Sequence, residues 1–106
     1  MALLALALAL TLVIEVPIVA LFYPGQRLRM GLACAVATSI TNVALNFALL
    51  RQLFAFDTTL LVGETLALVF EALVYIWMAP ARGWPRALAA SAAANLASFG
   101  VGLIFF

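Results

Sequence analysis

Four long apolar stretches, separated by short polar breaks, constrain this chain more than any other feature of its sequence. They cover residues 2–23, 30–50, 59–79 and 87–106. A bilayer core about 30 Å thick is crossed by an α-helix of about 20 mostly apolar residues. Each stretch is continuously apolar rather than alternating, which favours helices over the strands of a membrane barrel. The sequence therefore predicts an all-α membrane protein, with one transmembrane domain over 1–106 and four spans.

The composition agrees with this class. Of the 106 residues, 69% are hydrophobic and 8% are charged, whereas a soluble domain has about 45–50% apolar and about 25% charged residues. There are too few polar side chains to cover a water-facing surface, so we expect the surface to face lipid. The N-terminal Ala/Leu tract lacks the basic residues of a signal peptide and continues past Glu15. We therefore interpret it as the first span.

The breaks between the spans predict how the helices are connected and oriented. Pro24, Gly25, Pro80 and Gly83 are turn-forming residues in the first and third breaks. Such short connections force neighbouring helices to run antiparallel, which predicts an antiparallel four-helix bundle.

The arginines predict which way the bundle faces. Loops 24–29 and 80–86 carry four of them, whereas the second break carries one arginine offset by an acid; the residues are Arg27, Arg29, Arg82 and Arg86 against Arg51 and Asp57. The positive-inside rule then predicts that loops 24–29 and 80–86 are cytoplasmic and that both termini are outside. Arginine without lysine, together with abundant alanine, is compatible with a bacterial plasma (inner) membrane.

Several functional classes are excluded by residues that the chain lacks. A net charge of +1 is too small for nucleic-acid binding, which depends on neutralising phosphates. The chain has no histidine and one cysteine, Cys34, so imidazole chemistry, an intramolecular disulfide and multi-cysteine metal sites are ruled out. We find no phosphate-binding loop and no hydrolase or zinc-protease motif. The sequence therefore predicts no cofactor, no metal site and no enzyme activity.

The two halves of the chain show a possible internal repeat. A shift of 56 residues, without a gap, places the segment that ends at Glu15 on the segment that ends at Glu71, and Pro24 on Pro80. This favours two repeated helical hairpins related by a pseudo-two-fold axis along the membrane normal. Because each glutamate lies nine residues before its proline, we expect both at nearly the same depth.

Three acids lie inside the predicted spans, Glu15, Glu64 and Glu71, and no lysine or arginine lies deep in a span to pair with them. A charged group at the bilayer centre costs about 2.5–3.5 kcal/mol on insertion scales, so such residues usually face a bundle interior or a water-filled cavity. We expect Glu15 and Glu71 to meet inside the bundle. Two carboxylates that are close together cannot both ionise cheaply, so they would share one proton or one cation.

Polar side chains in the other spans repeat every three or four residues, which places them on one face of each helix. The second span has Thr38, Asn42 and Asn46, with Thr41 beside them, and the fourth has Ser91, Asn95, Ser98 and Gly102. Such faces avoid lipid by facing one another. We predict an ion- or proton-binding cluster, with Glu64 and Asn46 on its outer side: Glu15, Glu71, Glu64, Asn42, Asn46, Asn95, Thr38 and Ser91.

Two functional hypotheses remain open at this point. The first is proton- or cation-coupled transport or conduction, in which the partners are the lipid bilayer, a proton or small cation, and further copies of the chain. The second is a structural or assembly subunit of a membrane complex, in which the polar residues form interhelical hydrogen bonds or pair with a partner membrane subunit. Lipid or quinone handling and a carboxylate enzyme are further alternatives. Glutamates that point inward favour the first hypothesis, and glutamates that point outward favour the second.

Overall fold

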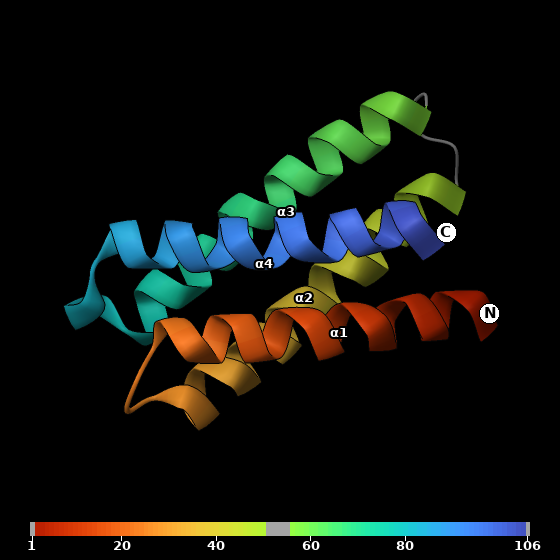
Figure 1. Cartoon of the computed structure of the whole chain (residues 1–106). Coiled ribbons are helices and arrows are strands. Elements are labelled where there is room, and N and C mark those ends of the chain that lie inside the picture. Colours follow the sequence, from red (N-terminus) through yellow and green to blue (C-terminus); the bar gives the residue numbers. More distant parts are fainter. Residues whose placement is uncertain (1, 51–55, 106) are drawn as a thin grey trace.

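The computed structural model describes residues 2–50 and 56–105 (Figure 1). Within these ranges, the side chains of residues 2–4, 46, 48–50, 56–60, 103 and 105 lie outside the description. The described residues form four α-helices and one short 3-10 helix, with no strands: α1 Ala2–Phe22, α2 Arg27–Leu50, α3 Phe56–Met78, η1 Pro80–Arg82 and α4 Trp84–Phe105. The predicted all-α class with four helices is confirmed.

Each helix that follows a loop begins three residues before the predicted span. The predicted limits followed hydropathy, but a helix can begin among polar residues, and arginine is a strong helix former. Arg27 and Arg29 accordingly lie in the first turn of α2. Pro85 lies in the first turn of α4, where its missing N–H breaks no intrahelical hydrogen bond.

The four helices form an antiparallel bundle with a square cross-section. Each helix packs against its neighbours in sequence, and α4 also packs against α1. Hence α1 and α3 lie on one diagonal, and α2 and α4 lie on the other. Figure 1 shows both termini at one end of the bundle, here called the terminal end, and loops 23–26 and 79–83 at the other, here called the loop end. The molecule measures 40 × 23 × 20 Å.

The outer face of the bundle is strongly apolar. Leu28 is 79% exposed, Trp77 is 78% exposed, and many other large apolar side chains point outward. Within the described residues, α1, α2 and α3 are long and apolar enough to cross a membrane. The predicted fourth span, 87–106, corresponds to α4 and is not among these three.

Buried positions recur in the two hairpins. Those of α1 and its end recur 56 residues later, whereas four of those of α2 recur 57 residues later: Glu15, Val19 and Tyr23 match Glu71, Tyr75 and Ala79, and Met30, Cys34, Ala37 and Thr38 match Ala87, Ser91, Ala94 and Asn95. Loop 79–83 is one residue longer than loop 23–26. The gap-free shift of 56 is therefore wrong for the second helix of each hairpin, because it ignores this extra residue.

Two arginines join the hairpins at the loop end. Arg86 Nη1 donates to the carbonyl oxygen of Phe22 at 2.7 Å, and Arg82 donates to that of Pro24. The last carbonyl groups of a helix have no intrahelical donors. The second hairpin thus supplies donors at the exposed C-terminus of α1.

Both loops turn at a glycine with a left-handed backbone, since φ is 84° at Gly25 and 88° at Gly83. We expect Gly25→Ala and Gly83→Ala each to lower the free energy of unfolding by about 1–2 kcal/mol, because a Cβ is unfavourable at positive φ. Gly100 lies in α4 with open space around it, so Gly100→Ala should stabilise by up to about 1 kcal/mol. Thermal unfolding in detergent measures the three variants. Equal melting temperatures for all three would contradict the strain argument.

Candidate functional site

Two buried carboxyl groups occupy the centre of the bundle. Glu15 on α1 is 2% exposed and Glu71 on α3 is 1% exposed. They project from diagonally opposite helices and line the same cavity. We call these two residues the carboxyl pair. Helical spacing explains their direction, because Val19 and Tyr75 lie four residues further along the same faces and are also fully buried.

Glu15 is held by one donor from each adjacent helix. Thr38 Oγ1 on α2 donates to Glu15 Oε1 at 3.0 Å. Ser98 Oγ on α4 donates to Glu15 Oε2. Both oxygens of this carboxylate therefore accept a hydrogen bond from a neutral hydroxyl group.

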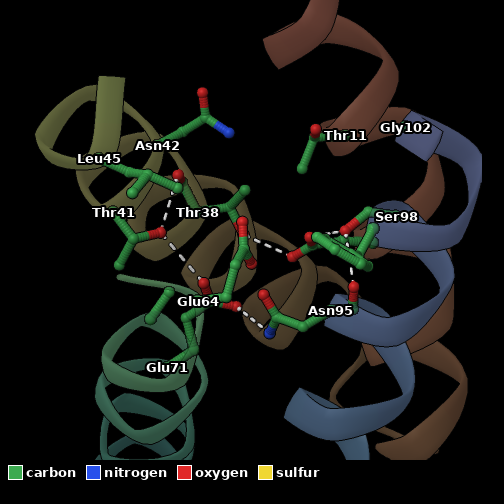
Figure 2. Close-up of a pocket in the computed structure, with 13 residues that line it drawn as sticks. Thr11, Thr38, Thr41, Asn42, Leu45, Glu64, Glu71, Asn95, Ser98 and Gly102 are labelled. Atoms are coloured by element: carbon green, nitrogen blue, oxygen red, sulfur yellow. Dashed lines mark hydrogen bonds between the residues drawn. The ribbon is translucent and has the colours of Figure 1, made fainter. Parts of the chain in front are cut away.

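Glu71 is held in the same way. Thr41 Oγ1 on α2 donates to Glu71 Oε2, and Asn95 Nδ2 on α4 donates to Glu71 Oε1, both at 3.1 Å. Figure 2 shows Thr38 and Thr41 facing the site from α2, and Asn95 and Ser98 facing it from α4.

The two sets of donors match one another. Thr38 and Asn95 are 57 residues apart, as are Thr41 and Ser98, and in each helix the two donors are three residues apart. The donors thus follow the same correspondence between the two hairpins as the buried positions do, which gives the site an approximate two-fold symmetry. Two hairpins of similar geometry each supply one acid and two donors.

A polar cavity lies on the terminal side of the carboxyl pair. Its volume is about 160 Å³, and Thr11, Asn42, Glu64 and Gly102 line it together with the pair and its donors (Figure 2). Since one water molecule occupies about 30 Å³ of liquid, this volume holds a few of them. A groove of about 400 Å³ between α3 and α4 shares Glu64, Asn95 and Phe99 with the cavity. Glu64 therefore lies between the cavity and the outer face.

On the loop side, a close-packed layer separates the carboxyl pair from the loops. We call it the tyrosine layer, and its buried residues are Val19, Tyr23, Met30, Cys34, Tyr75, Ala79, Ala87, Ala90 and Ala94. The rings of Tyr23 and Tyr75 meet edge to face, with centroids 6.4 Å apart and an interplanar angle of 63°. The polar cavity and the tyrosine layer make the two sides of the pair chemically different.

The predicted cluster is assembled in part. Glu15, Glu71, Thr38 and Asn95 form the hydrogen-bonded centre, and Asn42 and Glu64 line the cavity. The side chains of Asn46 and Asp57, and the whole of Arg51, lie outside the described residues.

Ser91 does not reach either carboxylate. Its hydroxyl group donates to the carbonyl oxygen of Leu68 at 2.7 Å, and Asn95 Nδ2 approaches Ser91 Oγ at 3.4 Å and the Ser91 carbonyl oxygen at 2.8 Å. Ser91 therefore orients Asn95, which in turn binds Glu71, and it does not contribute to the oxygen shell directly.

Thr41 and Ser98 were missing from the predicted cluster, although each donates to a glutamate. Their spacing from the predicted donors indicates that they belong to the same cluster. Each lies three residues after a predicted donor, Thr38 or Asn95, and residues three apart lie on neighbouring positions of one helical face.

The carboxyl pair has no cationic neighbour among the described residues that line the cavity. A buried charge without a partner is strongly unfavourable in a low-dielectric interior. Two ionised carboxylates at this position would therefore lack a compensating charge in the lining of the cavity. Arg82 and Arg86 do not supply it, since they bind backbone carbonyl groups at the loop end.

The donors should contribute measurably to stability. We expect Thr41→Val to lower the free energy of unfolding by about 1–3 kcal/mol, because it leaves a buried carboxylate oxygen without its donor. Thr65 is the matched control, since its exposed hydroxyl group donates within α3 to Leu61, and Thr65→Val should change stability by less than about 0.5 kcal/mol. Thermal unfolding of both variants in detergent tests this. An equal effect of the two substitutions would show that the bond to Glu71 contributes nothing.

No protein-family model, curated protein or solved structure matches this chain. The features of the chain that bear on its function are therefore those of the site itself, namely two buried carboxyl groups, four neutral donors, a polar cavity on one side and the tyrosine layer on the other.

Proposed function

We propose that this chain is a four-span membrane protein that binds a proton, or a small cation, at the carboxyl pair and carries it across the bilayer. The observation that supports this most strongly is that two buried carboxylates have four neutral donors, with no cationic residue among the described residues that line their cavity. Ionisable groups held inside a membrane bundle are typical of proton and ion pathways.

The composition of the outer face supports the proposed membrane insertion. Exposed leucine, valine and aromatic side chains cover the bundle, and contiguous apolar surface of this kind is unfavourable in water. In the proposal α4 is the fourth span, because Leu88, Leu96 and Ile104 extend the exposed apolar face along it. Loops 24–29 and 80–86 face the cytoplasm of a bacterial cell, in accordance with their arginines.

The chemistry of the donors suits a site that is alternately loaded and empty. Thr38, Thr41 and Ser98 bind through hydroxyl groups, which can donate to an ionised carboxylate or rotate to accept from a protonated one. Their oxygens are also ligands for a small hard cation. Loading and release therefore require rotation of hydroxyl groups and no rebuilding of the site.

The direction of the glutamates supports transport over the structural-subunit hypothesis. A subunit that offers acids to a partner chain would present them on its outer face, whereas Glu15 and Glu71 are almost fully enclosed. Each of their four carboxylate oxygens also accepts a hydrogen bond from a side chain of this chain.

Reconstitution into liposomes tests the proposed function. Vesicles containing the purified chain and an internal pH dye receive a pH gradient, with the membrane potential clamped by a potassium ionophore. We expect proton flux above that of protein-free vesicles. Sodium and potassium gradients at equal pH on both sides then show whether a cation is carried instead. A chain that carries none of these ions would contradict the proposal.

A further inference from the structure

Three buried polar atoms have no hydrogen-bond partner among the described residues: the hydroxyl oxygens of Tyr23 and Tyr75, and Oε1 of Gln26. Both tyrosines are 0% exposed. Buried polar groups are nearly always paired, so each exception needs an explanation. Both tyrosine hydroxyl groups belong to the tyrosine layer, on the side of the carboxyl pair away from the cavity.

These groups extend a line of polar atoms that begins at the carboxyl pair. Glu15 accepts from Thr38, and Thr38 Oγ1 lies 3.7 Å from Cys34 Sγ. Cys34 and Tyr75 belong to the same buried cluster, and the Tyr75 ring packs on Tyr23.

The line ends at the loop-end arginines. Arg86 and Arg82 donate to the carbonyl oxygens of Phe22 and Pro24, the residues on either side of Tyr23 in the chain. Groups with exchangeable protons therefore cross a layer that otherwise consists of alanine, valine and methionine.

We propose that Tyr75 and Tyr23 form the route by which protons pass between the carboxyl pair and the loop end. This inference rests on the proposed function and makes it more specific, because it identifies the carried species as a proton. A cation would need a passage lined by oxygen ligands, whereas the side chains of the tyrosine layer offer only two hydroxyl groups and one thiol among apolar residues. A proton needs only a series of groups that accept on one side and donate on the other.

Protons and charge are conserved at each step of the proposed transfer. The protonated carboxyl group gives its proton to a neighbouring hydroxyl or thiol group, which passes its own proton onward, so that every relay group ends neutral. No group is oxidised or reduced. The carboxylate that remains takes up a new proton from the cavity side, past Glu64. A tyrosine hydroxyl group without a fixed partner can rotate between its two neighbours, and water that enters the layer would bridge any longer gap.

Tyr23→Phe and Tyr75→Phe test the route, because each removes one oxygen and keeps the edge-to-face ring contact. We expect proton flux in proteoliposomes to fall about tenfold or more in each variant, as for loss of a positioned proton-transfer group. Trp77→Phe is the control, because Trp77 is exposed on the outer face, and it should keep the wild-type flux.

A second measurement separates a proton route from a structural role. Infrared spectroscopy in D₂O follows exchange of the proton on the carboxyl pair. We expect this exchange to remain at the wild-type rate in both tyrosine variants, since it occurs from the cavity side. Melting temperatures should not fall, because each variant loses an unpaired buried hydroxyl group.

The outcomes are distinguishable. Wild-type flux in both tyrosine variants would overturn the route and leave the carboxyl-pair function standing. Loss of both flux and exchange would also overturn it, because the tyrosines would then only hold the pair in place. Absence of proton flux from the wild-type chain would instead overturn the proposed function, and the route with it.

Discussion

Glu71→Gln is expected to reduce proton flux in proteoliposomes to the level of protein-free vesicles, and Glu15→Gln should do the same. The amide group is neutral and does not take up a proton near neutral pH, so the pair can no longer bind and release one. The remaining glutamate also loses the neighbour whose charge acts on it. Intramembrane carboxyl groups on proton pathways act through this change of protonation.

The loss should not reflect misfolding, because glutamine has the shape of glutamate. At position 71 the amide oxygen can still accept from Asn95 Nδ2, and the amide nitrogen can donate to Thr41 if that hydroxyl group rotates. We therefore expect the Gln variants to keep the wild-type elution volume and melting temperature within a few degrees.

Two further variants sharpen this prediction. Glu64→Gln should lower flux less than either central substitution, because Glu64 lines the cavity at its outer side and is not one of the two central acids. The double variant Glu15→Gln, Glu71→Gln should be no worse than either single one, since groups that act as one unit are non-additive. Wild-type flux in Glu71→Gln would refute the role of the pair.

Ala90→Leu is expected to have the largest effect on stability. Ala90 is 0% exposed and belongs to the tyrosine layer, so an isobutyl group has no space unless the helices move apart. Overpacking of a core typically lowers the free energy of unfolding by about 1–3 kcal/mol. Because leucine adds three carbon atoms to the side chain of alanine, we expect a loss near the upper end of this range. The thermal unfolding of the purified variant in detergent should shift by a corresponding amount.

Ala89→Leu is the matched control. Residue 89 is exposed on the same helix, where leucine and alanine have similar helix propensity and the added side chain faces outward. Its melting temperature should stay at the wild-type value. Equal melting temperatures for the two leucine variants would mean that α4 does not pack against α1 and α3 through the face that contains Ala90.

The inward direction of the two acids is the part of the site that the sequence predicted best. An acid surrounded by apolar residues is so unfavourable in lipid that it must turn inward, and the constant helical pitch then places its neighbours at i+3 and i+4 on the same face. Glu15 and Glu71 were expected to meet for this reason, and they do. Asn95 and Thr38 were found by the same spacing.

The correspondence between the donors of the second helix and those of the fourth could not be predicted in the same way. A gap-free repeat of 56 matches Asn95 with Ser39, whereas the buried counterpart of Asn95 is Thr38. One extra residue in loop 79–83 changes the helical phase by about 100°. The extra residue can lengthen the loop or shift the helix that follows. Which of the two occurs depends on the turn of the loop and on its contacts with the other loop, which Arg82 and Arg86 make here.

The sequence by itself determined the helical class, the apolar exterior and the pairing of two acids, because each follows from hydropathy and from the constant pitch of a helix. Only the tertiary structure decided that Ser98 binds Glu15 while Ser91 supports Asn95, and that two buried tyrosine hydroxyl groups on the loop side of the pair have no hydrogen-bond partner among the described residues. Such contacts depend on the rotation of one helix against another, and the packing of the whole bundle sets that rotation.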